Sequence, residues 1–227
     1  MNEIQAKKRR VVRAGRPPRK DAGQVDERIL DAARQVLLDR GLAGASIDEI
    51  ASIARAGKPT IYARFPGKEA LFTAVVLRNC AAAIAKFESD PPSGATLNAR
   101  LTDLGSSVLH WIFSGPTIDL MRASISEARR LPELANNVHI MARRGSEDAV
   151  ARILTEAAQA APDGALPAFA PERVATTARF FVDFVVMPMV LRALHGEKLE
   201  SLRADIKPQI AARVPFFLAA CRHGGVN

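Results

Sequence analysis

From Val25 to Cys221, apolar residues recur every three or four positions, which is the period of an amphipathic α-helix. Nowhere does the sequence show the alternating β-branched pattern, bounded by turn residues, that is typical of strands. A chain with this pattern can bury its apolar residues only by packing helix against helix. We therefore predict an all-α protein.

Residues that stop or start helices divide this pattern. Gly41 supplies the left-handed residue that commonly ends a helix, and Pro59 fits only a first turn. Ser46 and Glu49 match a capping box, in which the serine side chain accepts from the amide three residues on and the glutamate reaches back. Pro188 is expected to kink its helix. The predicted helices are 25–40, 47–55, 58–65, 68–87, 96–113, 117–130, 133–160, 171–194 and 201–221.

Composition excludes several classes of protein. With 227 residues, 48% of them hydrophobic, the chain can build a substantial core. The longest strongly apolar stretch, Phe180 to Leu191, is interrupted by Asp183 and is shorter than the roughly 20 residues of a membrane helix. No secretory signal is found, so we expect a cytoplasmic protein without a membrane segment. Cys80 and Cys221 lie far apart in no metal-binding or redox spacing, and we expect no cofactor and no metal.

The net charge of +8 is concentrated in an N-terminal arm. Residues 1–20 hold eight Lys or Arg against Glu3, a net charge of +7, which leaves +1 for the rest of the chain. Such a segment cannot bury enough surface to fold alone, so we predict a disordered basic arm over residues 1–22 that binds a polyanion. The alternative is a tail that only improves solubility.

Two short helices joined by a tight turn and packed against a third form a helix-turn-helix, which inserts its last helix into the major groove of DNA. If Ile61 and Phe65 face the core, then Pro59, Thr60, Tyr62 and Ala63 lie on or beside the outer face of the helix 58–65. Lys58, Pro59, Thr60 and Tyr62 suit contacts with bases and phosphates, while Ser46 and Lys68 begin flanking helices and suit phosphates. Alternatively, the Tyr62 ring only covers the small core.

Residues 29–72 resemble the DNA-binding domain of the TetR family, most clearly at Ile50-Ala51 and over the run from Lys58 to Phe72. The resemblance implies DNA contacts from Ser46, Lys58, Pro59, Thr60, Tyr62, Arg64 and Lys68. The sequence departs from the family in the turn, where Arg55 stands in place of the usual glycine and Gly57 in place of the usual Ser or Thr cap. Arg55 is either a further phosphate contact or a solvated turn residue. Arg16 lies in a Gly-Arg-Pro sequence similar to the arms that enter the minor groove.

Residues 120–134 resemble the C-terminal domain of an AefR-like branch of the family. The expected architecture is therefore a helix-turn-helix domain over 23–72 and a larger helical effector-binding and dimerisation domain over 73–221. The resemblance implies a homodimer in which helices 173–194 and 201–221 of two subunits form a four-helix bundle. Asp183, a carboxylate within an apolar run, needs a partner such as Arg179, the second subunit or an effector. The candidate effector-binding residues, each of which is otherwise plain core or interface, are His110, Trp111, Met121, Ile125, Phe180 and Asp183.

These features predict a dimeric transcription regulator that acts as a repressor and leaves a palindromic operator when a small, mostly apolar effector binds. Activation is the alternative sign. An enzyme is a rival class, but the sequence lacks the common nucleotide, zinc and nucleophile motifs and its four histidines are scattered. A second rival is a non-specific architectural protein that binds any duplex through its arm.

Overall fold

The computed structural model describes residues 19–160 and 166–222, and within these ranges it is helical with no strand. This confirms the all-α prediction. Arg16 and the rest of the arm up to residue 18 lie outside the described residues. The helices are α1 Arg19–Gly44, α2 Ile47–Ala54, α3 Lys58–Tyr62, α4 Lys68–Ser89, α5 Leu97–Ser114, α6 Thr117–Glu127, α7 Pro132–Ala160, α8 Val174–Phe181, α9 Met187–Leu194 and α10 Leu199–Arg222, with a 3-10 turn η2 at Pro167–Phe169 and a π-helical turn η3 at Val182–Val186.

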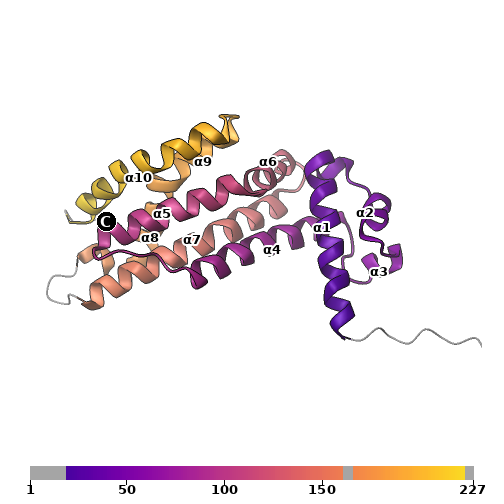
Figure 1. Cartoon of the computed structure of the whole chain (residues 1–227), viewed down its shortest axis with the longest axis horizontal. Coiled ribbons are helices and arrows are strands. Elements are labelled where there is room, and N and C mark those ends of the chain that lie inside the picture. The colour runs from indigo at the N-terminus through magenta and orange to yellow at the C-terminus, as the bar shows by residue number, and fades with distance from the viewer. Residues whose placement is uncertain (1–18, 161–165, 223–227) are drawn as a thin grey trace, which may run out of the picture.

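The helices form two lobes that share α4 (Figure 1). In the smaller lobe, α1 stands across the start of α4, and α2 and α3 lie on its far side. This lobe buries Ile29, Leu37, Ile50, Ile61 and Phe72 in one core. In the larger lobe, α5, α7, α8, η3, α9 and α10 surround a second core.

The expected domain boundary at residue 72 lies inside α4. Leu71, Phe72, Val75 and Val76 of α4 are all buried in the small-lobe core, and Phe87 near its C-terminal end is buried in the core of the larger lobe. Helix α4 therefore takes part in both cores and is one of the connections between the lobes. Leu120 of α6 and Val138 of α7 also join the small-lobe core.

Helix α1 extends beyond its predicted range at both ends. It begins at Arg19, inside the segment that we assigned to the disordered arm, so residues 19–22 belong to the helix. At the other end Gly41 has the expected left-handed conformation (φ 67°), but helical turns resume after it up to Gly44. Gly41 thus marks a kink at the predicted stop.

Helix α3 is shorter than predicted. It ends at Tyr62, and Ala63 and Arg64 form a turn before Pro66-Gly67 and the start of α4. The rigid element that presents the outer face is therefore five residues long, not eight.

The helix predicted over 171–194 contains a π-helical turn just before Pro188. Proline has no amide hydrogen and its ring clashes with the carbonyl four residues earlier. The turn η3 accommodates it by widening, and the amide of Met187 donates to the carbonyl of Val182, five residues back. The expected disturbance at Pro188 thus takes the form of a π turn.

Two helical stretches, Lys68–Ser89 and Val174–Leu194, are long and apolar enough to cross a membrane by length and composition alone. In the described structure both pack against other helices, with Phe72 and Val76 of the first and Phe181 and Val185 of the second buried. These helix contacts account for part of their apolar character.

Candidate DNA-binding face and effector cavity

The outer face of α3 carries the side chains expected there. Ile61 is fully buried and anchors the helix, while Lys58, Pro59 and Tyr62 are exposed and Thr60 is half-buried. The exposed fraction of Tyr62 is 52%, so its ring does not cover the core. Phe65, expected on the core, is half-buried against it. The side chains at 58, 59 and 62 are accessible to a ligand as large as a DNA duplex.

Ser46 caps α2, although not through the full capping box. Its side chain accepts from the amide of Asp48 at 3.2 Å, two residues on instead of three. Glu49 does not reach back to Ser46, because its carboxylate pairs with Arg40 of α1 (Nη2 to Oε1, 2.8 Å). The cap therefore fixes the start of α2, and Glu49 joins α2 to α1.

Lys58, the first residue of α3, pairs with Asp48 of α2 at 2.5 Å from Nζ to Oδ1. Both side chains are exposed, and the hydrogen bond from Lys58 to Asp48 raises the pKa of the lysine. The pair aligns the two short helices. A contact between Lys58 and DNA requires that this pair rearrange.

Arg64 and Lys68, which we expected to face DNA, both make contacts within the lobe. Arg64 Nε donates to the carboxylate of Asp26 on α1, and its Nη1 donates to the carbonyl of Thr60 at 3.3 Å. Lys68 Nζ donates to the carbonyl of Ala43 at 2.8 Å. Both side chains hold the small lobe together, and neither is a freely exposed cation.

Arg55 occupies the left-handed conformation (φ 50°) at the C-terminus of α2, and no other non-glycine residue of the described chain has positive φ. The amide of Ala56 donates to the carbonyl of Ala51 at 3.0 Å, as in a Schellman motif. Glycine usually fills this position because a Cβ is strained there. The exposed side chain of Arg55 makes no ion pair within the described residues.

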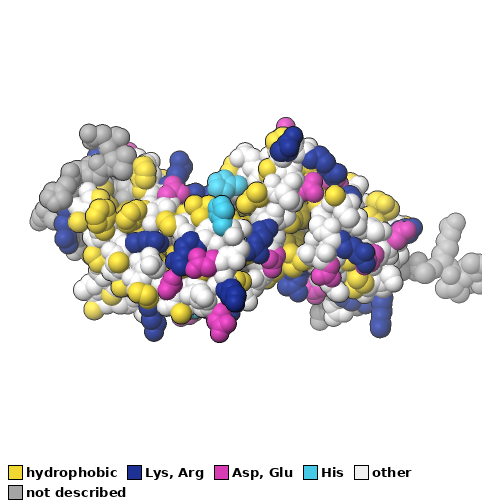
Figure 2. Space-filling model, turned by 90° about the horizontal axis from the view of Figure 1, so that it is seen from above, with side chains coloured by type: hydrophobic (Ala, Val, Ile, Leu, Met, Phe, Trp, Pro, Cys, Tyr) yellow, Lys and Arg dark blue, Asp and Glu magenta, His cyan; other side chains and the backbone are white. Residues whose placement is uncertain are grey.

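The small lobe as a whole is electrically balanced. Residues 23–72 contain seven Lys or Arg and seven Asp or Glu, so their net charge is zero. On the face shown in Figure 2, basic and acidic side chains are interspersed, with no extended area of one sign. The strong positive charge of the chain lies N-terminal to this lobe.

A cavity of about 330 Å³ lies in the larger lobe between α4, α5, α6, α7, η3 and α9. Of the six predicted effector residues, Trp111, Met121 and Ile125 line it. His110, Phe180 and Asp183 are not among the residues that line it. Most of the wall is apolar. The polar or ionisable side chains of the wall that sequence reasoning missed are Asn79, Cys80, Thr117, Ser124, His139, Arg143 and Ser146.

Asp183 has a partner other than the expected Arg179. Its Oδ1 lies 2.7 Å from Nη1 of Arg143 on α7. Arg143 also donates through Nε to Glu147 at 2.9 Å. Burial acts to lower the pKa of Arg143, but the hydrogen bonds with Asp183 and Glu147 raise it above its ordinary value. The guanidinium is therefore a permanent cation in the wall of the cavity.

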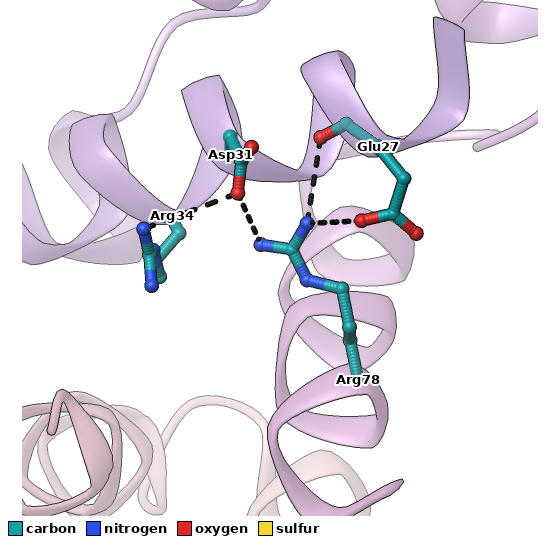
Figure 3. A network of polar contacts seen from close by, with 4 residues as sticks. All are labelled: Glu27, Asp31, Arg34 and Arg78. Atoms are coloured by element: carbon teal, nitrogen blue, oxygen red, sulfur yellow. Dashed lines mark hydrogen bonds and ion pairs between the residues drawn. The ribbon is translucent and has the colours of Figure 1, made fainter. Parts of the chain in front are cut away.

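Arg78 joins α4 to α1 (Figure 3). Its Nη1 donates to the carboxylate of Glu27 at 2.9 Å, and its Nη2 donates to Asp31 at 2.9 Å. The next residue, Asn79, lines the cavity and donates to Thr117 Oγ1 of α6 at 3.1 Å. Adjacent residues of α4 thus contact the small lobe and the cavity wall.

Large apolar side chains are exposed on the face formed by α8, η3 and α10. Phe180 and Phe184 are 39% and 40% exposed, and Phe216 is 68% exposed. The rings of Phe184 and Phe216 stack with their centroids 5.5 Å apart. These helices are the two that we expected to pair with a second subunit.

A short helix with an exposed polar face, a tight turn and two supporting helices, joined to a helical lobe with an apolar cavity, is typical of a helix-turn-helix regulator. The profile described as bacterial regulatory proteins, tetR family, matches residues 29–75. The profile described as AefR-like transcriptional repressor, C-terminal domain, matches residues 99–222. The chain belongs to the TetR family of transcription regulators, with a C-terminal domain of the AefR-like type, and both parts of the resemblance are confirmed.

Solved structures agree with this assignment. A regulator from Mesorhizobium loti assigned to the family superposes with a TM-score of 0.74 at 22% identity, covering 88% of this chain and 97% of that one. The flavonoid-responsive regulator FrrA superposes with a TM-score of 0.63 at 27% identity, covering 87% of this chain and 97% of that one. FadR from Bacillus subtilis, in complex with stearoyl-CoA, superposes with a TM-score of 0.54 at 19% identity, covering 87% of this chain and 98% of that one. Comparison with curated protein sequences gave no significant match.

Proposed function

We propose that this chain is a cytoplasmic repressor that binds a palindromic operator as a homodimer and leaves it when a small, mostly apolar effector fills the cavity. The observation that carries the proposal is the position of α4. One side of α4 lines the cavity through Asn79 and Cys80, and the residue next to them, Arg78, binds α1 of the DNA-binding lobe. Any change in α4 on ligand binding is transmitted to α1.

The proposed DNA contacts come from two sources. Lys58, Pro59, Thr60 and Tyr62 enter the major groove, and Ser46 and Arg55 contact phosphates beside it. Since residues 23–72 have no net charge, the basic arm, including Arg16, supplies most of the counterion release. Each phosphate that the arm neutralises adds roughly 0.9 to the slope of log affinity against log salt concentration.

The proposed homodimer pairs the α8–η3–α9 helix and α10 with those of a second subunit. The exposed apolar side chains of this face, Phe180, Phe184 and Phe216, lose contact with water in that arrangement. A two-fold dimer places its two α3 helices in successive major grooves when they lie about 34 Å apart. Effector binding lowers operator affinity by moving α4 and so changing this spacing.

The cavity supports a mostly apolar effector, because few polar side chains interrupt its wall. The names of two similar proteins record ligands with large apolar parts: FrrA is flavonoid-responsive, and FadR was seen with stearoyl-CoA. Cys80 does not suggest redox sensing. Burial raises the pKa of its thiol, and it is the thiolate that reacts with oxidants.

The test is a gel-shift titration of the full chain with DNA from upstream of its own gene, against scrambled DNA of the same length and at the same moderate salt concentration. A specific regulator binds the upstream DNA at least 10³-fold more tightly. Equal affinities for both DNAs would instead support an architectural protein and refute the proposal. Deletion of residues 1–18 is expected to weaken binding to both DNAs and to reduce the salt slope, with little change in their ratio.

A further inference from the structure

The wall of the cavity contains a single Lys, Arg, Asp or Glu side chain, Arg143 of α7. Its guanidinium has three nitrogens, and two of them have acceptors: Nε binds Glu147 and Nη1 binds Asp183. The third, Nη2, is buried without a hydrogen-bond partner, and it is the one such side-chain nitrogen or oxygen found in the described part of the chain. A buried donor on a charged group is costly when it has no acceptor.

An acceptor for Nη2 can come from a ligand in the cavity. Arg143 borders the cavity, but Nη2 itself is covered, so neighbouring wall side chains must shift slightly for a ligand atom to reach it. Met121, Met141 and Met187 line the same cavity, and methionine is the apolar side chain that repacks most easily. The wall therefore combines a donor in need of an acceptor with a lining that can adjust to one.

The surroundings of Arg143 determine the charge of that acceptor. Asp183 and Glu147 together bring two negative charges to one guanidinium, so the group carries a net charge of −1 without a ligand. A ligand carboxylate at the buried Nη2 would be a third negative charge beside one positive charge, and Asp183 and Glu147 would repel it. A carbonyl oxygen accepts the same hydrogen bond without that repulsion.

We propose that the effector is an uncharged, largely apolar molecule with a carbonyl oxygen, and that this oxygen accepts a hydrogen bond from Nη2 of Arg143. The inference rests on the proposed function, because it takes the cavity as the effector site. It adds the chemical class of the ligand and the residue that recognises it. The apolar body of the ligand fills the remainder of the cavity against Trp111 and Ile112.

The experiment compares three probes with one skeleton: 2-hexanoylnaphthalene, which carries a ketone; 2-hexylnaphthalene, which has no acceptor; and 6-(2-naphthyl)hexanoate, which is an anion. Their dissociation constants are measured by isothermal titration calorimetry with the full-length wild-type chain and with Arg143→Met. The ketone is expected to bind the wild type most tightly. Arg143→Met is expected to weaken ketone binding roughly 10- to 100-fold, the loss of a hydrogen bond to a charged donor, and to leave hydrocarbon binding unchanged.

Arg144→Met is the matched control, since Arg144 follows on the same helix, is 79% exposed and pairs with Asp148 outside the cavity. It should leave all three affinities unchanged. If Arg143→Met also fails to bind the hydrocarbon, its cavity has collapsed and this variant does not test the hydrogen bond. Arg143→Lys then provides the test, because lysine keeps the positive charge but lacks the planar guanidinium. Weaker ketone binding by the lysine variant, with hydrocarbon binding retained, supports the proposal, and unchanged ketone binding refutes it.

Two results separate this inference from the proposed function. Equal ketone affinities in the wild type and Arg143→Met would overturn the role of Arg143. Tightest binding of the carboxylate would overturn the inference that the effector is uncharged. Either result would leave the effector cavity intact. Failure of all three probes to bind a chain that still recognises its operator would overturn both the inference and the proposal of an apolar effector.

Discussion

The backbone of Arg55 forms a turn, and its side chain is proposed to contact DNA. Its backbone makes the tight left-handed turn between α2 and α3, which glycine makes without strain. Its side chain is exposed beside the DNA-binding face, where Arg64 and Lys68 are engaged in internal contacts. A residue that is unfavourable for the turn yet cationic at this position is consistent with the proposed phosphate contact.

Substitution Arg55→Gly is expected to stabilise the fold and weaken DNA binding. Relief of the left-handed strain contributes about 1–2 kcal/mol, and the greater freedom of glycine in the unfolded chain offsets about 0.5–1 kcal/mol of it. The free energy of unfolding, measured by urea denaturation, should therefore rise by about 0.5–1 kcal/mol. Arg55→Ala separates the two effects, since it removes the charge and keeps the strain. An unchanged operator affinity in both variants would show that Arg55 is only a solvated turn residue.

At the scale of the element, α4 is the helix on which the proposed regulation depends. It begins in the small-lobe core with Leu71 and Phe72 and continues along the cavity with Cys80 and Ile84. Arg78 lies between these two stretches and holds Glu27 and Asp31 of α1 (Figure 3). A shift of α4 therefore cannot leave α1 unaffected while this ion-pair cluster is intact.

Substitution Arg78→Met is expected to weaken the response to effector more than it weakens the fold. The two ion pairs are partly exposed, so their loss should cost about 1 kcal/mol of folding free energy or less. The 2-hexanoylnaphthalene affinity should stay the same, while the factor by which that probe reduces operator affinity should fall toward one. Fluorescence anisotropy of labelled operator DNA, with and without the probe, measures this factor.

Lys86→Met is the control for Arg78→Met on the same helix, because Lys86 is exposed and pairs only locally with Asp90. It should respond to the probe like the wild type. An undiminished response in Arg78→Met would place the coupling elsewhere than in this ion-pair cluster.

At the scale of the whole molecule, the two lobes divide the proposed tasks of DNA binding and dimerisation. The α3 helix lies at one end of the molecule, and the α10 helix lies along the other lobe (Figure 1). Phe216 of α10 is two-thirds exposed and stacks on Phe184, so an apolar aromatic pair faces outward there. An aromatic cluster of this kind is typical of the centre of a protein interface.

Substitution Phe216→Glu is expected to shift the chain from dimer to monomer, because it places a charge at the centre of the proposed interface. Sedimentation equilibrium measures the change, which we expect to exceed 10-fold in the dimer dissociation constant, the loss of one interface anchor. Operator affinity should fall with it, since two half-sites are no longer bound by one particle. Leu77→Glu is the control, as Leu77 is also exposed but lies on α4. A Phe216→Glu chain that sediments like the wild type would refute the proposed interface.

Features that depend on residues within one helical turn could be predicted from the sequence. Ser46 caps α2, Gly41 takes its left-handed conformation, and Ile61 anchors α3, because each depends on residues only a few positions away. The run from Lys58 to Phe72 also sufficed to indicate the family. The exposed face of α3 follows from the same short-range pattern.

Contacts between helices distant in sequence were decided by packing. A helical neighbour, Arg179, was the partner expected for Asp183, but α7 brings Arg143, forty positions earlier, to 2.7 Å. Arg64 was expected outside, but Asp26 of α1 holds it. His110 and Phe180 lie on faces that turn away from the cavity, while Arg143 and His139 turn toward it. The helical period determines which side chains lie on the same face of one helix. Which neighbouring helix that face contacts depends on how all the helices pack together.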